Sequence, residues 1–232
     1  RSVQESTRWL DEGWQNQARP VWDRVDLGFL SMIKKLEEMS LEELWQLFPI
    51  FLVEHKSEWK DWYESEKTSL KKILGANVIQ RIEHIGSTAI PNIWAKNIVD
   101  ILLEVGKIED LARVRDLLVK NGWLVMSESP NRISLNKGYT EQGFAEKVFH
   151  LHLRMTGDHD EIYFRDYLCQ HPDIAQAYQE LKLNLWKKFE HNRDAYTAGK
   201  TDFINHYVSE AKSRNFQESE KFHQKSLDRR KN

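Results

Sequence analysis

The chain has 232 residues, 40% of them apolar and 30% charged, which gives room for one domain with a buried core and extensions, or for two small domains at most. Its 34 Lys and Arg and 36 Asp and Glu leave a formal charge of −2, which argues against a dedicated nucleic-acid binder and is compatible with a phosphorylated small-molecule ligand. The single cysteine excludes an internal disulfide, and the lack of a transmembrane-length apolar run and of a signal-peptide pattern predicts a cytoplasmic protein without a membrane span.

Residues 1–38 predict a helical extension ahead of the main domain. Trp9, Trp14 and Trp22 are spaced for one or two amphipathic helices interrupted by a proline. Because the chain begins at Arg1 rather than at a methionine, a missing upstream domain stays an open alternative. The extension is therefore a candidate contact for a protein partner or for such a domain.

The first part of the main domain predicts two helices and then two strands. Ser40 and Glu43 form a capping-box pattern for a short helix, and residues 50–53 are compatible with a short strand. The apolar positions of residues 57–74 fall largely on one helical face, which predicts a longer helix. Two strands flanking a glycine-serine turn are predicted at residues 78–85 and 97–105.

The rest of the chain predicts further strands followed by a helical last third. Helix-like apolar spacing covers residues 108–120, and strand candidates follow at residues 123–126, 132–136 and 148–154. Further helices are predicted at residues 161–169, 172–189 and 193–211, and the polar residues 213–232 predict a disordered tail. This order of elements predicts an α+β fold, with helices packed against a mixed or antiparallel sheet.

The turn between the first two predicted strands has the chemistry of an anion site. Gly86, Ser87 and Thr88 offer accessible backbone N–H groups and two hydroxyls, which is what holding a triphosphate or another anion requires. Taken alone this signal is weak, because short Gly-Ser turns occur in many proteins that bind nothing there.

Asp100 strengthens the case for a site, because it interrupts an apolar strand. A carboxylate is costly to bury without a partner, so Asp100 is expected to face a cleft, a metal or a cationic side chain. The strand period of two puts Asp100, Leu102 and Glu104 on one face. At ~3.3 Å per residue the two carboxylates lie about 13 Å apart, too far to share one ion. Glu104 is therefore predicted to be the solvated end of the strand.

Two further groups of polar residues flank this strand in the sequence. Glu83 and His84 point to opposite sides of the preceding strand, so one of them is expected to face the cleft. His150, His152 and Arg154 alternate with leucines and so share one face of a later strand. Two histidines at this spacing can bind a metal, or they can form a hydrogen-bonded polar face, and both interpretations stay open.

Several basic residues are candidates for neutralising phosphate charge, although most of them are expected to be ordinary surface residues. They are Lys96, Arg132, Lys137, Arg165, Lys182, Arg193 and Lys200.

Six segments in order along the chain resemble the GrpB family, whose members are described as nucleotidyltransferase-like. They are IEHIGSTAIP at 82–91, AKNIVDILLEV at 95–105, FHLHLR at 149–154, FRDYL at 164–168, HPDIAQAYQELK at 171–182 and AYTAGKTDFI at 195–204. The resemblance covers about residues 39–212. It implies a nucleotidyltransferase-like mixed sheet packed with helices.

The resemblance also implies what the site does. Active members of the wider superfamily hold phosphate with a glycine followed by serine or glycine, and bind magnesium with a pair of strand carboxylates at Asp-x-Asp or Asp-x-Glu spacing. Gly86, Ser87 and Asp100 occupy the matching places in this sequence. Leu102 stands where the second carboxylate belongs, so Glu83, one of the two later histidines or the substrate itself would have to replace it.

These observations predict a domain that binds a nucleotide or another phosphorylated small molecule, with Mg²⁺ as the expected cofactor. The predicted ligand-binding residues are Gly86, Ser87, Thr88, Lys96, His84 and Arg165. For a metal-dependent nucleotidyltransferase the predicted catalytic residues are Asp100, Glu83 and His152, and the predicted metal ligands are Asp100, His150 and His152. The alternative is a non-catalytic ligand-binding or adaptor domain that kept the fold but lost the second metal carboxylate.

Overall fold

The computed structural model describes the backbone of residues 34–229 and the side chains of residues 34–214. The predicted helical extension, with Trp9, Trp14 and Trp22, lies outside the described residues except for its last few positions. The helical elements are η2 (Leu36–Glu38), α2 (Leu41–Leu47), α3 (Glu58–Leu74), η3 (Ser87–Ala89), α4 (Ile108–Lys120), α5 (Asp160–Gln170), α6 (Pro172–Phe189) and α7 (Arg193–Arg229). The strands are β1 (Ile79–Ile85), β2 (Val99–Val105), β3 (Leu124–Ser129), β4 (Arg132–Thr140) and β5 (Gly143–Met155).

The five strands form one mixed sheet in the order β1-β2-β5-β4-β3. The pair β2–β5 is parallel, and the other three pairs are antiparallel. The predicted α+β fold with a mixed sheet is therefore confirmed. The parallel pair matters most for the site, because it sets Asp100 directly beside His150 and Leu102 directly beside His152.

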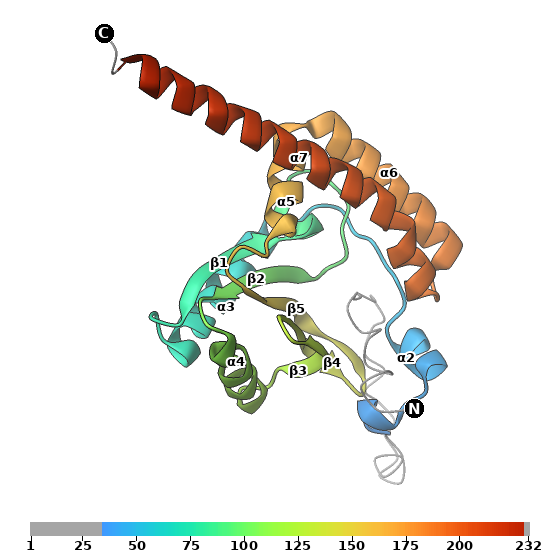
Figure 1. Ribbon diagram of the computed structural model, residues 1–232. Coiled ribbons are helices and arrows are strands. Elements are labelled where there is room, and N and C mark those ends of the chain that lie inside the picture. Colours follow the sequence, from blue (N-terminus) through green and yellow to red (C-terminus); the bar gives the residue numbers. More distant parts are fainter. Residues whose placement is uncertain (1–33, 230–232) are drawn as a thin grey trace.

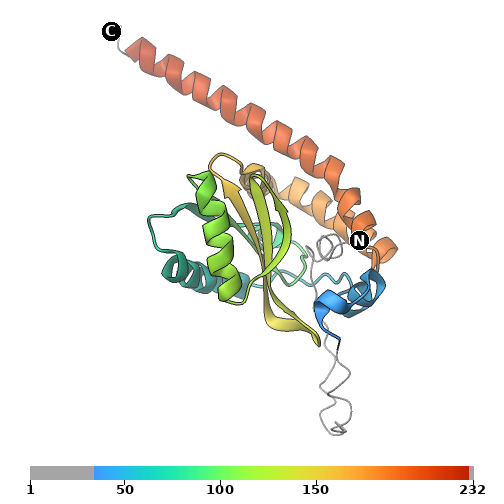
Figure 2. The same ribbon diagram turned by 60° about the horizontal axis from the view of Figure 1, so that its bottom comes forward.

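One face of the sheet is apolar and is covered by α3 and α4 (Figure 2). Alternate residues of the two central strands point into this core, including Val99, Ile101 and Leu103 of β2 and Leu151 and Leu153 of β5. They pack against Trp59 and Leu70 of α3 and Leu111 and Val114 of α4. Apolar residues alternate in the sequence of these strands because every second side chain packs into this core.

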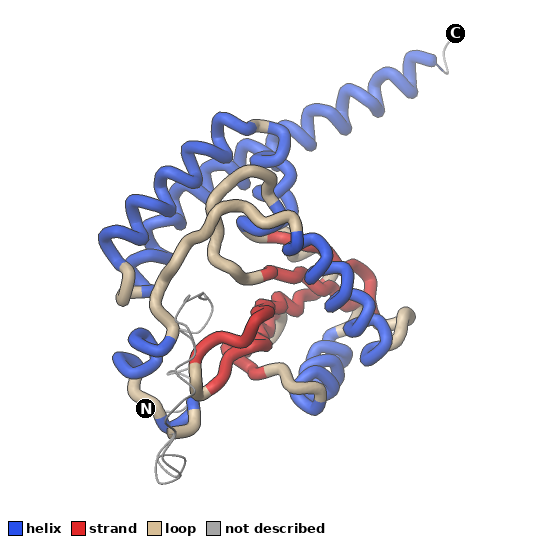
Figure 3. The backbone as a smooth tube through the Cα atoms, turned by 180° about the vertical axis from the view of Figure 1, so that it is seen from behind, coloured by secondary structure: helices blue, strands red, loops and turns tan. Residues whose placement is uncertain are grey.

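The opposite face of the sheet carries Asp100, His150 and His152. This face lies toward the helices α5, α6 and α7 (Figures 1 and 3). These helices have an apolar cluster of their own, in which Phe164 of α5 contacts Tyr178 of α6 and Val208 of α7 takes part. Because this cluster holds the helices to one another, they can cover the sheet without filling the space over its polar face. A cavity remains there.

Two segments differ from the sequence-based prediction. Residues 50–53, predicted as a strand, contribute only an isolated bridge between Val53 and Ala95 in a link from α2 to α3. The segment after Ser213, predicted as disordered, continues α7 as a helix to Arg229, and its backbone extends away from the sheet (Figure 1). No Gly or Pro interrupts the chain between Lys200 and Arg229, so nothing in the sequence ends the helix. Although α7 has 37 residues, none of the helices in the described part is long and apolar enough to cross a membrane.

Candidate functional site

A cavity of about 590 Å³, called the main cavity below, lies between the polar face of the sheet and the helices α5, α6 and α7. Its sheet side is formed by Ile85, the turn at residues 86–88, Ile98, Asp100, Arg132, His150 and His152. Its helix side is formed by residues of the three helices, among them Phe164, Tyr178, Lys182, Arg193, Tyr196 and Lys200. The walls of the cavity therefore come from two parts of the chain that are far apart in the sequence.

The turn at Gly86 is in close contact with Asp100. Gly86 has φ +70°, which favours glycine, and a Cβ atom built there would overlap Oδ2 of Asp100 and lie 2.8 Å from its Cγ. The carboxylate can approach the backbone this closely only because residue 86 has no side chain. Gly86 and Asp100 thus form one structural unit at the floor of the main cavity.

Two histidines of β5 face the same carboxylate. Nδ1 of His150 lies 3.3 Å from Oδ1 of Asp100, and Nε2 of His150 lies 2.7 Å from the hydroxyl of Tyr139. Nε2 of His152 lies 3.7 Å from Oδ1 of Asp100. Burial raises the pKa of Asp100, but the interactions with His150 and His152 outweigh burial and hold that pKa well below its usual range. The Asp100 carboxylate is therefore ionised.

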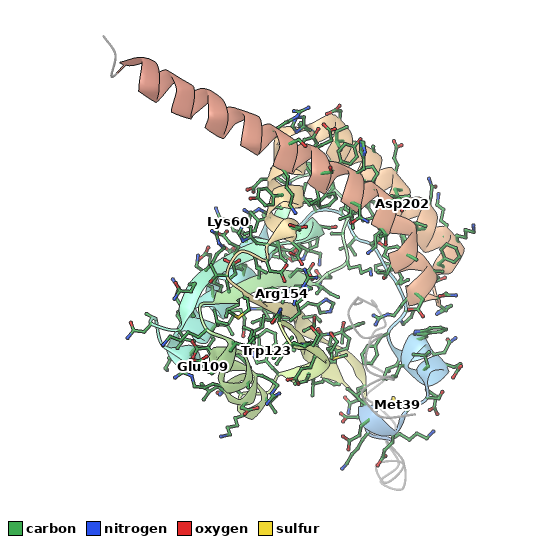
Figure 4. All side chains as sticks on the ribbon, viewed as in Figure 1. Met39, Lys60, Glu109, Trp123, Arg154 and Asp202 are labelled. Atoms are coloured by element: carbon green, nitrogen blue, oxygen red, sulfur yellow. The ribbon has the colours of Figure 1, made fainter. Side chains whose placement is uncertain are left out.

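Arg154 determines how His152 presents its ring. Nη2 of Arg154, the residue labelled in Figure 4, lies 3.2 Å from Nδ1 of His152. Since a guanidinium can only donate, Nδ1 accepts this hydrogen bond and the proton of the neutral ring is on Nε2, toward Asp100. His152 is thus arranged as a donor to the carboxylate.

Four cationic side chains from the loop before β2 and from the helices α6 and α7 line the main cavity, and we call them the cation cluster: Lys96, Lys182, Arg193 and Lys200. Lys182, Arg193 and Lys200 are only 2%, 3% and 8% exposed, although such residues are rarely buried.

Aromatic rings contact the lysines of the cluster. The ammonium groups of Lys96 and Lys200 lie 4.3 Å and 4.4 Å from the centroid of the Tyr196 ring. Lys182 lies over the ring of Tyr178 at 4.9 Å and donates to the carbonyl of Trp94. Contacts with aromatic rings hold the three lysines of the cluster in place.

Carboxylates that line the main cavity interact with other cations. Asp160 lies 2.5 Å from Nζ of Lys212, and Glu161 lies 3.7 Å from Nη2 of Arg154. Asp194 is half-buried, and burial raises its pKa, which disfavours its charged form. The helix side of the cavity therefore carries both cationic and acidic side chains.

Several of the predicted site residues line the main cavity together: Gly86, Ser87, Thr88, Lys96, Asp100, His150 and His152. The other three predicted residues lie elsewhere. Nη1 of Arg165 is 3.2 Å from the carboxylate of Glu83 and 2.7 Å from the carbonyl of His84. Arg165 and His84 line a second cavity of about 360 Å³, on the other side of Thr88.

The sheet register explains this separation. Ile85 of β1, not Glu83, pairs with Asp100, and Glu83 lies opposite Leu102. The His84 ring points to the other face, where it stacks on Tyr63 with ring centroids 5.0 Å apart and bonds the hydroxyl of Thr88 at 2.9 Å. Grouping Glu83, His84 and Arg165 with Asp100 around one ligand is therefore not what the structure shows. Arg165 connects α5 to β1.

Glu104 corrects a second prediction. Its side chain is 1% exposed, where the sequence predicted a solvated strand end. The carboxylate accepts from the backbone N–H of Gly157 at 2.8 Å and lies 2.7 Å from Nδ1 of His159 and 2.9 Å from Nε of Arg81. Because β5 pairs with β2 in parallel, the loop after β5 folds over the end of β2 and buries this carboxylate.

The donor atoms around Asp100 do not fit a two-metal centre. Leu102, in the place of a second carboxylate, is 0% exposed and packs against Ile85 and Ile162. Both ring nitrogens of His150 have protein partners, and His152 directs a proton at Asp100. Within residues 34–214, no group of three or more His, Cys, Asp or Glu side chains has the arrangement of a metal site. The sequence-based expectation of Mg²⁺ bound by Asp100, His150 and His152 gains no support from this arrangement.

Three members of the cation cluster were among the basic residues noted in the sequence but were not singled out there: Lys182, Arg193 and Lys200. A signal for two of them existed. Tyr178 precedes Lys182 by one helical turn, as Tyr196 precedes Lys200, so each lysine shares a helix face with an aromatic residue. Of the others noted, Lys137 instead pairs with Glu66 at 2.7 Å.

The fold and the main cavity define a small α+β domain with a cleft between a mixed sheet and a layer of helices. The family model described as GrpB protein matches residues 49–210 of this chain. The chain therefore belongs to the GrpB family.

Similar proteins agree with this assignment. The UPF0157 protein YqkA of Bacillus subtilis is 32% identical over 170 residues, which cover 71% of this chain and 48% of YqkA. Glutamate-rich protein GrpB of Alkalihalophilus pseudofirmus is 32% identical over 69% of this chain and 95% of its own length. The crystal structure of conserved protein GrpB from Enterococcus faecalis aligns with a TM-score of 0.63 and 30% identity, over 72% of this chain and 99% of that one. The chain thus spans about half the length of YqkA and nearly all of the two proteins named GrpB.

Proposed function

We propose that this GrpB-family domain binds a nucleotide or another phosphorylated small molecule in the main cavity. The observation that carries the proposal is the cation cluster, in which three of the four side chains are almost fully buried and all four line one cavity. Gathering like charges in a poorly solvated place costs free energy, and an anion bound among them offsets that cost. A multiply charged phosphate group is such an anion.

The dimensions and the walls of the main cavity support this proposal. A volume of about 590 Å³ is in the range of sites for small ligands. The turn at Gly86 belongs to the sheet side of the cavity and supplies Ser87 as a hydrogen-bonding group, whereas the hydroxyl of Thr88 already bonds His84. A phosphate group between these two walls would meet charge on one side and hydroxyl or N–H donors on the other.

Metal-dependent nucleotidyl transfer is the second function that the sequence suggested. The buried Leu102 supports the non-catalytic alternative, because no carboxylate of β2 joins Asp100 on the cavity wall. Our proposal is therefore ligand binding in the main cavity, and it assigns no turnover to the site.

The proposal is tested by isothermal titration of the full chain with ATP, GTP, CTP and UTP, with and without Mg²⁺. We expect at least one of these nucleotides to bind and the Lys200→Gln variant to weaken that binding by about tenfold or more, since charge-assisted hydrogen bonds to phosphate are lost. The exposed Lys120 of α4 provides a matched control, and Lys120→Gln should leave the affinity unchanged. Failure of all four nucleotides to bind, or equal effects of the two substitutions, would contradict the proposal.

A further inference from the structure

The main cavity is lined by acidic as well as cationic side chains, so a ligand with negative charge alone does not complement all of its walls. Four carboxyl groups line it, one from the sheet and three from the helices: Asp100, Asp160, Glu161 and Asp194. Asp160 and Glu161 lie close to cationic side chains, Lys212 and Arg154. The carboxylate on the sheet side has no such neighbour and is therefore the one to match with a group of the ligand.

Asp100 presents a hydrogen-bond acceptor to the main cavity. Its side chain is 26% exposed, and its Oδ1 atom faces Nδ1 of His150 at 3.3 Å and Nε2 of His152 at 3.7 Å. Within residues 34–214, no Lys or Arg forms an ion pair with Asp100, and no group donates a hydrogen bond to its Oδ2 atom. Because an ionised carboxylate only accepts hydrogen bonds, Oδ2 is available to a donor of the ligand.

This acceptor is held in a fixed position. On one side, the backbone of Gly86 lies so close to Oδ2 that a Cβ atom on residue 86 would overlap it. On the other side, the His150 ring is itself held by the hydroxyl of Tyr139, 2.7 Å from its Nε2 atom. A preorganised acceptor favours a ligand that places a donor in the matching position, because little freedom is lost on binding.

The position of Asp100 indicates which part of a phosphorylated ligand meets it. A phosphate group near neutral pH is negatively charged and rich in acceptors, so it does not donate to a carboxylate. Asp100 adjoins the turn at Gly86, where Ser87 belongs to the proposed phosphate site, so the donor must be close to the phosphate in the ligand. In a nucleotide or a sugar phosphate, the sugar hydroxyls are such donors, and carboxylates bind ribose hydroxyls in dinucleotide-binding folds.

A divalent ion is the competing occupant of this position, and two observations disfavour it. Leu102, the next residue of β2 on the same face, is buried in apolar packing, so it offers no oxygen to an ion. Nδ1 of His152 accepts from Arg154, so the proton of the neutral ring is on Nε2, which faces Asp100. A protonated ring nitrogen has no lone pair for a metal.

We propose that Asp100 accepts a hydrogen bond from a sugar hydroxyl of the ligand. The main cavity then binds a phosphorylated sugar, such as a ribonucleotide, in preference to the corresponding deoxy compound. This assignment rests on the proposed function, because it takes the ligand to be phosphorylated. The hydrogen bond is charge-assisted, which makes it stronger than one between neutral groups.

The first experiment removes the hydroxyl from the ligand. The full chain is titrated calorimetrically with whichever of ATP, GTP, CTP and UTP binds most tightly, and with the 2′-deoxy and 3′-deoxy forms of that nucleotide, in EDTA and in excess Mg²⁺. We expect at least one deoxy form to bind about tenfold or more weakly in both buffers, because the acceptor made for the hydroxyl is left unpaired. This comparison uses the wild-type chain and does not depend on the folding of a variant.

The second experiment removes the acceptor from the protein and completes a double-mutant cycle with the ligand. The measured quantity is the ratio of the affinities for the ribonucleotide and the weaker deoxy form, in which any uniform effect of the Asp100 charge on the phosphates cancels. Asp100→Ala should reduce this ratio to about twofold or less, and Asp100→Asn, which keeps one neutral acceptor, should also reduce it. Asp61→Ala, at an exposed position of α3, is the control and should leave the ratio unchanged. Thermal melting verifies that each variant is folded.

The outcomes separate this inference from the proposed function. A preference for the hydroxyl of about tenfold in EDTA that Asp100→Ala abolishes supports the inference. Equal affinities for the ribonucleotide and both deoxy forms overturn it and leave nucleotide binding in the main cavity intact. A preference that Asp100→Ala leaves unchanged, or that exists only in Mg²⁺, overturns it as well, since another residue or a metal would then bind the hydroxyl. Failure of all four nucleotides to bind overturns the proposed function and this inference together.

Discussion

Gly86 leaves no room for a side chain beside Asp100 on the floor of the main cavity, and this close approach makes a prediction at the scale of single residues. Gly86→Ala should destabilise the protein for two reasons: the positive φ disfavours a Cβ atom, and that atom would overlap the Asp100 carboxylate. We expect a loss of about 2 to 4 kcal/mol in the free energy of unfolding, measured by urea denaturation.

Gly75 provides the matched control for this substitution. It also has a positive φ, of +78°, but a Cβ atom added there would meet nothing within 4 Å. Gly75→Ala should therefore cost only the backbone strain, about 1 kcal/mol. Equal losses for the two variants would show that Asp100 does not restrict residue 86, contrary to the structure.

His84 makes a prediction about pH. Burial lowers its pKa to about 4 in the folded protein, against an ordinary value of 6.5. Between these two values the unfolded chain binds a proton that the folded protein does not, so stability falls as the pH drops from 6.5 toward 4. At about pH 4.5 we expect His84 to cost roughly 2 to 3 kcal/mol relative to neutral pH.

The measurement for His84 is urea denaturation of the wild-type chain and of His84→Gln at neutral pH and at about pH 4.5. The variant should lose less stability on acidification than the wild-type chain does. His191→Gln replaces an exposed histidine and is the control, because it should leave the loss of stability on acidification as it is in the wild-type chain. A His84→Gln variant as acid-sensitive as the wild-type chain would exclude His84 as a source of the pH dependence.

Glu104 makes a prediction at the scale of elements, because it joins β2 to the loop that leads from β5 into α5. Burial raises its pKa, but His159, the N–H of Gly157 and Arg81 together hold the pKa below its ordinary value, so the charge is satisfied inside the fold. Glu104→Gln should lower the free energy of unfolding by about 2 to 4 kcal/mol, since the negative charge and one of the two acceptor oxygens are lost and an NH₂ donor then faces other donors.

Glu141, exposed in the turn between β4 and β5, is the control for Glu104. Glu141→Gln should change stability by about 0.5 kcal/mol or less. Amide hydrogen exchange at Gly157 gives a local test, because its N–H donates to Glu104. Because glutamine keeps one acceptor oxygen, Glu104→Leu is measured as well, and unchanged exchange at Gly157 in Glu104→Leu would argue against a role for this carboxylate in holding the loop.

The outcome for Glu104 illustrates what sequence reasoning can and cannot predict about elements. The period of two correctly put Asp100 and Glu104 on one face of β2, and His150 and His152 on one face of β5, because alternation is a local property of strands. Whether β2 and β5 are neighbours depends on pairing across a long stretch of chain, which no local pattern contains. The burial of Glu104 and the contacts of Asp100 with the histidines both follow from that pairing.

At the scale of the whole molecule, the main cavity exists because two layers meet without filling the space between them. The sheet wall, with Gly86 and Asp100, was predictable from the sequence, since it occupies one continuous stretch with recognisable chemistry. The helix wall was not, because the sequence does not show which face of α6 and α7 lies over the sheet. The tyrosine one turn before Lys182 and before Lys200 marks a shared helix face, but only the packing of those helices shows that this face lines the main cavity.

The most direct measurement of the central claim is a crystal structure of the full chain bound to ATP. The account predicts phosphate oxygens in the main cavity, within hydrogen-bonding distance, about 2.7 to 3.2 Å, of Lys182, Arg193 and Lys200. The contradicting result would be phosphates bound in the second cavity, beside Lys56 and Arg165, with the cation cluster unchanged from the ligand-free chain.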